Sequence, residues 1–312
     1  MTITQERAKG PIGSSTTATN LIQTLQAPRR NSTQYRFWRR LWRHKLGMFG
    51  LSMLLLLVIA AVFAPVVAGR DPVAMELGNK NLPPSAEHIL GTDAIGRDGW
   101  ARLVYGARIS LSVGLVAVGI YTTIALLLGS VSGYMGGFVD TVIMRFTDII
   151  MCFPTFLLIM TAAAVLPPNI FNIMVIIGIF GWPGMTRLVR SQFLSLRSQD
   201  FVLAAVASGV PTRRIIFHHI LPNVVGPIVV AATLGLAGAI MTESSLSFLG
   251  LGVQQPTPSW GQTLTTAMQL PILENMPWRW IPSAAAIALT VLSVNFFGDA
   301  LRDAFDPRMT LD

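Results

Sequence analysis

The sequence predicts an all-α polytopic membrane protein with six transmembrane helices, and three observations support this prediction. Of the 312 residues, 52% are hydrophobic and only 12% are charged, a balance too apolar for an ordinary soluble globular protein. Several apolar runs approach or exceed the length of about 20 residues that a helix needs to cross a bilayer. The excess positive charge is confined to one N-terminal segment, which is typical of a membrane protein's topology signal.

The N-terminal segment, residues 1–45, carries the whole excess of positive charge. It contains nine of the 23 basic residues and one acidic residue, Glu6, so fourteen basic and fourteen acidic residues remain for the rest of the chain. The basic residues next to the first span are expected to hold this segment in the cytoplasm. Residues 10–31 are rich in Ser, Thr, Gln and Pro, which predicts partial disorder. Because the rest of the chain is neutral, a nucleic-acid partner is not indicated.

The predicted spans are long apolar runs. The first, residues 46–68, contains no charged residue and is long enough to cross the hydrocarbon core. An even number of spans returns the C-terminal tail, residues 304–312, to the cytoplasmic side. The other five predicted spans are residues 109–134, 141–166, 170–185, 223–241 and 281–297.

Two hydrophilic loops separate these spans. Residues 69–108 form the predicted extracytoplasmic loop, with five basic and five acidic residues. The transmembrane core then runs over residues 109–303 and includes a cytoplasmic loop, residues 186–222. That loop holds five arginines against one acidic residue, Asp200, as the positive-inside bias predicts.

The cytoplasmic loop is predicted to contain two short helices. Residues 200–209 begin with an acid, which suits a helix N-terminus, and end in Gly209, which suits a helix C-terminus. A second helix is predicted from Thr212, a capping residue, to Pro222, where the next span begins. The loop is thus either a projecting surface on which another protein docks or an amphipathic element lying on the membrane.

Charged side chains within spans are costly and therefore informative. Arg145 and Asp148 are spaced i, i+3, which predicts a structural ion pair on one helix face, with solute contact as the alternative. Glu243 is expected at the outer end of its span, within reach of water. The single cysteine, Cys152, and the absence of any Cys/His cluster predict neither a disulfide within the chain nor a metal site.

Sequence segments spread over the chain resemble one known family. These segments are HILGTDAIGRD, GARISL, DIIMCFP, TRLVRSQFLSLR, ESSLSFLGLGVQQPTPSWG and NFFGDALRDAFDPR. They resemble, in the same order, segments of the C-type permease subunits of the dipeptide/oligopeptide branch of ABC importers, and the resemblance covers about residues 35–309.

The cytoplasmic loop is similar to that of ABC-importer permeases. The family pattern is Glu-Ala-Ala, then Gly after three residues, then Ile-x-Leu-Pro after about nine more. Leu203 stands where the family has glutamate, which removes any ionic contribution from that position. The residues that match are Ala204, Ala205, Gly209, Ile220, Leu221 and Pro222.

The resemblance implies a type I ABC-importer permease fold with both termini in the cytoplasm of a bacterial cell, embedded in the inner-membrane lipid. It implies a second homologous permease subunit, two ATP-binding subunits and an extracytoplasmic solute-binding protein as partners. The solute would be a di- or oligopeptide or a similar small molecule.

The resemblance also implies roles for individual residues. The residues expected to contact the ATPase are Ala204, Ala205, Gly209, Arg213, Arg214, Leu221 and Pro222. No residues are expected to be catalytic, because the chain has no phosphate-binding G-x-x-x-x-G-K-[ST] loop; no cofactor is expected, since ATP would be bound by the partners.

Two other classes of protein agree less well with the sequence. A self-contained secondary transporter would use intramembrane carboxylates such as Asp148 as ion sites and would show repeated halves, which this sequence lacks. A membrane-embedded enzyme would need a nucleophile or metal ligands near His218 and His219, and neither is present in the sequence around them.

Overall fold

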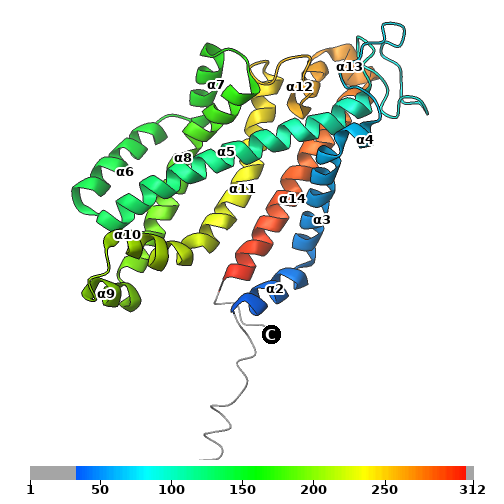
Figure 1. Ribbon diagram of the computed structural model, residues 1–312. Coiled ribbons are helices and arrows are strands. Elements are labelled where there is room, and N and C mark those ends of the chain that lie inside the picture. The colour runs from blue at the N-terminus through cyan, green and yellow to red at the C-terminus, as the bar shows by residue number, and fades with distance from the viewer. Residues whose placement is uncertain (1–32, 307–312) are drawn as a thin grey trace, which may run out of the picture.

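A computed structural model describes residues 33–306, and the named secondary-structure elements within this range are all helices (Figure 1). The predicted disorder of residues 10–31 and most of the C-terminal tail lie outside the described residues. The long helices are α3 (Lys45–Val62), α5 (Gly99–Met135), α6 (Gly137–Met151), α7 (Thr155–Val165), α8 (Ile170–Arg197), α11 (Leu221–Phe248) and α14 (Ile281–Phe305). The short ones are α2 (Thr33–Arg43), α4 (Ala64–Ala68), α9 (Asp200–Ala207), α10 (Thr212–Arg214), η1 (Ile215–Ile220), α12 (Trp260–Leu264), η2 (Thr265–Met268), α13 (Leu270–Asn275) and η3 (Pro277–Arg279).

The described helices include up to six candidate membrane spans, one of them broken. Five helices in the described range are long and apolar enough to cross a membrane, and α6 with α7 completes the sixth at a bend of 77°. The sequence predicted one continuous span over residues 141–166. Pro154 precedes the first residue of α7, and a proline there has no N–H to continue the hydrogen-bond ladder of α6. The six-span prediction is confirmed, with this break added.

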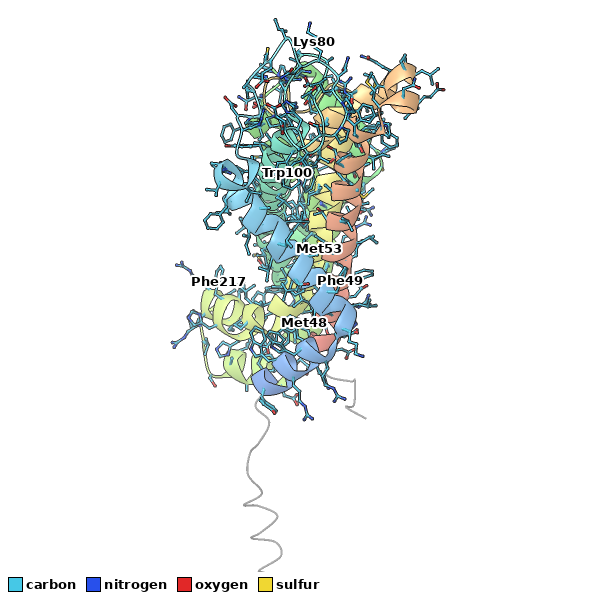
Figure 2. All side chains as sticks on the ribbon, turned by 90° about the vertical axis from the view of Figure 1, so that its right-hand side faces the viewer. Met48, Phe49, Met53, Lys80, Trp100 and Phe217 are labelled. Carbon is cyan, nitrogen blue, oxygen red and sulfur yellow. The ribbon has the colours of Figure 1, made fainter. Side chains whose placement is uncertain are left out.

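The bundle has two distinct ends (Figure 1). The α9 and α10 helices lie at one end, together with α2 and the last turn of α14. The segment between α4 and α5 lies at the other end, together with α12 and α13. Figure 2 shows Phe217 and Lys80 at these opposite ends.

Several helices extend beyond the apolar runs that predicted them. Helix α5 begins at Gly99 instead of residue 109, because the Asp98 carboxylate caps it by accepting a hydrogen bond from Ala101 N at 2.8 Å. Helix α8 continues to Arg197 and α14 to Phe305. The apolar runs mark the part of a helix suited to lipid, whereas the helices continue through polar residues at their ends.

Glycines allow α5 and α8 to pack closely. A Cβ atom built on Gly129 would lie 2.7 Å from the Cβ of Val189 and 2.8 Å from the carbonyl oxygen of Thr186. A Cβ atom built on Gly133 would lie 2.6 Å from the Cβ of Phe193. Small residues at such crossings let two backbones approach in a membrane bundle.

A paired substitution in α5 tests this packing. Gly129→Ala is expected to destabilise the protein by about 1–3 kcal/mol, because the added methyl group meets the backbone of α8. Gly119→Ala is the control: its Cβ meets nothing within 4 Å, so the gain in helix propensity favours it. Thermal unfolding of both proteins in detergent measures the difference, and equal losses from the two substitutions would contradict the packing.

Ion pairs tie α6 to α8, and one of them corrects a prediction. Asp148 accepts a hydrogen bond from Arg187 Nη2 of α8 at 2.5 Å, whereas Arg145 is exposed and forms none of the ion pairs found among the described residues. The predicted Arg145–Asp148 pair is therefore wrong. Spacing along one helix shows that two charges can meet, but it does not reveal a better partner on a neighbouring helix. A second pair joins the same helices, since Arg190 donates to both carboxylate oxygens of Asp140 at 2.5 and 2.6 Å.

Glu243 lies near the C-terminal end of α11, but its surroundings differ from the prediction. Its side chain is fully buried, at 0% exposed, so the prediction that water reaches it is wrong. Serine hydroxyls surround the carboxylate: Ser247 Oγ lies 2.8 Å away, Ser110 Oγ of α5 lies 3.0 Å away and Ser244 Oγ lies 3.3 Å away. Ser110 is also 3.4 Å from Trp260 N of α12, so Glu243 links α5, α11 and α12.

Candidate functional site

Residues 200–220, here called the α9–η1 loop, project from one end of the bundle (Figure 1). Helix α9 ends in a turn around Gly209, whose φ of +72° is a left-handed conformation that favours glycine. Gly209 N donates to Val206 O at 3.0 Å and Val210 N donates to Ala205 O at 3.1 Å, which satisfies the last carbonyls of α9. The loop therefore has a defined shape fixed by its own backbone.

The α9–η1 loop has its own buried apolar contacts. Val202 and Ala205 of α9 are buried together with Ile215 and Ile220 of η1, and all four belong to one apolar cluster. The η1 segment is a turn of π-helix that leads directly into α11, so that residues 212–248 form one helical stretch. The loop is therefore joined to a membrane span by continuous helical backbone.

The structure places the predicted contact residues on different surfaces of the loop. Ala205 is buried inside it and Leu221 is half-buried, so Ala205 shapes the loop and is not part of its outer surface. The predicted contact residues that are exposed are Ala204, Gly209, Arg213, Arg214 and Pro222.

Large apolar side chains cover the outer surface of the loop. Phe201, Leu203 and Val206 of α9 are 43%, 53% and 51% exposed, and Phe217 of η1 is 50% exposed (Figure 2). The sequence did not predict Phe201, Leu203, Val206 or Phe217 as contact residues. The pattern in α9 that could have predicted them is simple: two buried residues, Val202 and Ala205, are enough to pack the helix. The larger apolar residues between and beside them therefore remain exposed.

Basic groups lie beside this apolar surface. Arg213 and Arg214 line an open hollow of about 380 Å³ together with Pro211, Phe217 and His218. The combination of exposed aromatic, aliphatic and arginine side chains is typical of protein–protein contact sites. Within the described part of the chain, no cluster of three or more His, Cys, Asp or Glu side chains could hold a metal ion.

Comparisons with known proteins agree with these features. Residues 125–311 match the family described as binding-protein-dependent transport system inner membrane component, and residues 33–84 match the N-terminal TM domain of oligopeptide transport permease C.

Individual relatives cover most of the chain. It is 42% identical to a dipeptide transport system permease protein of Alkalihalophilus pseudofirmus, over 87% of this chain and 89% of that one. It is 41% identical to an oligopeptide transport system permease protein of Bacillus subtilis, over 85% and 87% of the two chains. It is also 41% identical to an oligopeptide transport system permease protein of Haemophilus influenzae, over 86% and 87%. With its six spans and these matches, the chain belongs to the family of inner-membrane components of binding-protein-dependent transport systems.

Proposed function

We propose that this chain is the permease subunit of an ATP-driven importer for di- or oligopeptides and that the α9–η1 loop couples it to separate ATP-binding subunits. The peptide class comes from the names of its relatives, which are dipeptide and oligopeptide transport permeases. The further partners proposed are a second homologous permease subunit and an extracytoplasmic solute-binding protein, with membrane lipid around the spans. The chain itself hydrolyses no ATP in this proposal.

The apolar outer surface of the α9–η1 loop is the observation that carries this proposal. Fully burying one Val, Leu or Phe side chain is worth about 1.5–3 kcal/mol, so a partner that covers this surface gains substantial binding energy. Arg213 and Arg214 at its edge favour an acidic rim on the partner. A groove on an ATP-binding subunit meets both requirements.

The connection of the loop to the spans supports coupling over simple attachment to the membrane surface. The η1 segment continues into α11, and the buried side chains Val202, Ile215 and Ile220 hold α9 against η1. Movement of a docked subunit would therefore reposition α11 and change which side of the bundle is open, a domain-level motion. An element lying loosely on lipid would transmit no such displacement.

The same arrangement supports a cytoplasmic location for both termini. Helix α2 and the last turn of α14 lie at the same end of the bundle as the α9–η1 loop (Figure 1). If ATP-binding subunits dock on this loop, that end faces the cytoplasm. The basic residues of α2, such as Arg39 and Arg40, agree with this orientation.

Uptake by reconstituted vesicles tests the proposal. The complex is expressed from the chain's native gene neighbourhood, purified and placed in liposomes with the solute-binding protein, and entry of labelled dialanine is measured with and without ATP. The expected result is uptake that requires both ATP and the binding protein and is inhibited by unlabelled peptides. Uptake by the chain alone without ATP would contradict the proposal and establish a secondary transporter instead.

A further inference from the structure

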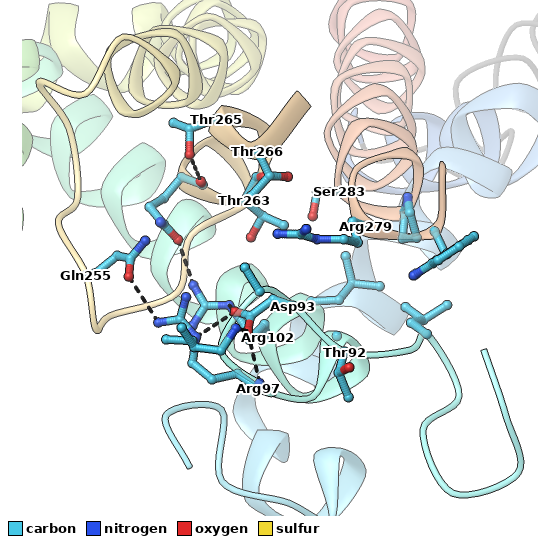
Figure 3. Close-up of a pocket in the computed structure, with 18 of the residues that line it drawn as sticks. Thr92, Asp93, Arg97, Arg102, Gln255, Thr263, Thr265, Thr266, Arg279 and Ser283 are labelled. Atoms are coloured by element: carbon cyan, nitrogen blue, oxygen red, sulfur yellow. Dashed lines mark hydrogen bonds and ion pairs between the residues drawn. The ribbon is translucent and has the colours of Figure 1, made fainter. Parts of the chain in front are cut away.

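The end of the bundle opposite the α9–η1 loop contains a pocket of about 230 Å³ that is lined by charged, polar and apolar side chains (Figure 3). Its wall is formed by the segment before α5, the first turns of α5, the region from Gln255 to Gln269 and the start of α14. These segments lie far apart in the sequence. The family resemblance assigns no role to this pocket.

Three arginines and a single carboxylate line the pocket. Arg97 and Arg102 are only 5% and 4% exposed, and the Arg279 side chain lies across the pocket from Asp93 (Figure 3). The lining therefore has a formal charge of +2. Buried arginines without enough acidic partners are costly to retain, because burial removes their hydration.

Asp93 is already fully engaged by its neighbours. It accepts hydrogen bonds from Arg97 Nε at 2.6 Å and from the backbone N–H groups of Ile95 and Arg97, both at 3.0 Å. Burial raises the pKa of Asp93, but these hydrogen bonds outweigh burial and lower the pKa below its ordinary value. Asp93 is therefore ionised at neutral pH and supplies one negative charge to the three arginines of the pocket.

Arg102 Nε lies 4.0 Å from Asp93 Oδ2, so this carboxylate serves two arginines, whereas the hydrogen bonds of Arg102 and Arg279 go to uncharged acceptors. Arg102 Nη2 donates to Gln262 Oε1 at 2.7 Å, and Arg97 Nη1 donates to Gln255 Oε1 at 3.3 Å. Arg279 Nη1 donates to Asn81 Oδ1 at 2.9 Å, whereas Arg279 Nε is buried and has no hydrogen-bond partner in the described structure. A guanidinium has five N–H donors, so donor capacity as well as positive charge is left over.

The pKa of Arg279 also indicates that its positive charge is only partly compensated. Burial lowers the pKa of Arg279, Asp93 acts to raise it and Arg97 lowers it further. The guanidinium remains protonated at neutral pH, but its charge is poorly compensated. A negative group placed in the pocket would compensate both Arg279 and Arg102.

We propose that this pocket is a binding site for a carboxylate group. Arginine forks match the two oxygens of a carboxylate, and the volume is below the range of about 300–1,000 Å³ typical of drug-sized ligands. The pocket therefore takes a single carboxylate-bearing unit and not a whole oligopeptide. The carboxylate comes either from the free C-terminus of a small solute or from an acidic side chain. The site lies at the opposite end from the α9–η1 loop and does not depend on the proposed ATP coupling.

Binding of acetate to the complete detergent-solubilised chain, measured by saturation-transfer NMR at constant ionic strength, tests the proposal. We expect saturable binding that Arg279→Gln weakens at least tenfold and Arg279→Lys weakens less. Arg70→Gln is the control, because it removes the same charge from a solvent-exposed pair with Glu76 and Glu87 and should leave binding unchanged. No saturable binding, or equal weakening by Arg70→Gln and Arg279→Gln, would overturn the proposal.

A second variant keeps all three arginines. Gln255→Glu places a carboxylate 3.3 Å from Arg97 Nη1, where it occupies the site from within. Acetate binding should be lost while the thermal unfolding temperature rises. A Gln255→Glu protein that is less stable than wild type, or that still binds acetate with wild-type affinity, would show that the pocket has no unmet positive charge.

Competition identifies the source of the carboxylate. Displacement of acetate by dialanine but not by dialanine amide identifies a solute C-terminus. Displacement by N-acetyl-aspartate amide but not by dialanine identifies an acidic side chain of a protein. Both results support the site, whereas acetate that none of the carboxylates displaces would mark non-specific binding and overturn it.

Discussion

Replacement of Phe217 by aspartate is expected to separate the chain from the proposed ATP-binding subunit while the membrane bundle stays folded. Phe217 is half exposed and lies beside Arg213 and Arg214 at the outer surface of the α9–η1 loop. Removing a central aromatic contact from a protein interface typically costs about 2 kcal/mol or more, which is about a 30-fold loss of affinity. The aspartate adds a desolvation cost, so the effect should be at the upper end of such losses.

Copurification and ATPase activity measure this effect. Phe217→Leu is the matched control, because it keeps an apolar side chain at the same position and should retain most of the binding. Both variants should reach the membrane and unfold at the wild-type temperature, since Phe217 is not part of the buried cluster of the loop. If the aspartate variant retains the ATPase with full coupled activity, the α9–η1 loop is not the docking site.

Glu243→Ala is expected to destabilise the bundle by about 2–4 kcal/mol, because it leaves a cavity and removes the acceptor of buried serine hydroxyls. The carboxylate accepts from Ser110 of α5 and Ser247 of α11, and Ser110 in turn lies next to the backbone of Trp260. Loss of Glu243 therefore loosens three elements at once. A shift in thermal unfolding of the detergent-solubilised chain measures this loss.

Two controls separate the buried hydrogen bonds from a general effect of charge. Glu243→Gln keeps the size of the side chain and one acceptor oxygen, so it should lose much less stability than Glu243→Ala. Glu274→Ala removes an exposed carboxylate from α13 and should change stability by less than about 0.5 kcal/mol. A Glu243→Ala protein as stable as wild type would show that this carboxylate does not hold the elements together.

The spans were predictable because hydropathy alone fixes which residues can face lipid. The runs at 46–68 and 281–297 correspond to α3 with α4 and to most of α14. Hydropathy alone did not reveal the bend between α6 and α7, because the apolar run over residues 141–166 continues across Pro154. The early start of α5 was also missed, although Asp98 is a capping residue whose position indicates where the helix begins.

Buried polar groups were the least predictable part of the structure. Arg97, Arg102 and Glu243 are charged in a sequence reading and would be placed in water, yet all three are buried. Arg97 pairs with Asp93 in the same loop, whereas Arg102 and Glu243 pair with Gln262 and Ser110, which are more than 100 residues away in the sequence. Single-sequence reasoning has no means of finding such contacts, because they depend on how distant segments meet.

The two short helices of the loop were predicted from the sequence, but its outer surface was not. The Gly209 turn and the two-helix arrangement followed from local residue preferences. Which side chains of α9 face outward depends on how α9 packs on η1, which fixes Ala205 inside and leaves Leu203 outside. Leu203 stands at the position where the family pattern has glutamate. We therefore propose that this position contacts the ATP-binding subunit through an apolar side chain and not through a charge.

Site-specific crosslinking tests the central claim most directly. The chain has a single cysteine, Cys152, so a Cys152→Ser background permits one new cysteine at Val206 in the α9–η1 loop, with one at Lys80 at the opposite end as the control. Each is labelled with a photoactivatable maleimide in the assembled, ATP-hydrolysing complex. The expected result is an adduct with an ATP-binding subunit from position 206 and none from position 80. An active complex that gives no such adduct from position 206 would contradict the claim that the α9–η1 loop is where ATP hydrolysis acts on this permease.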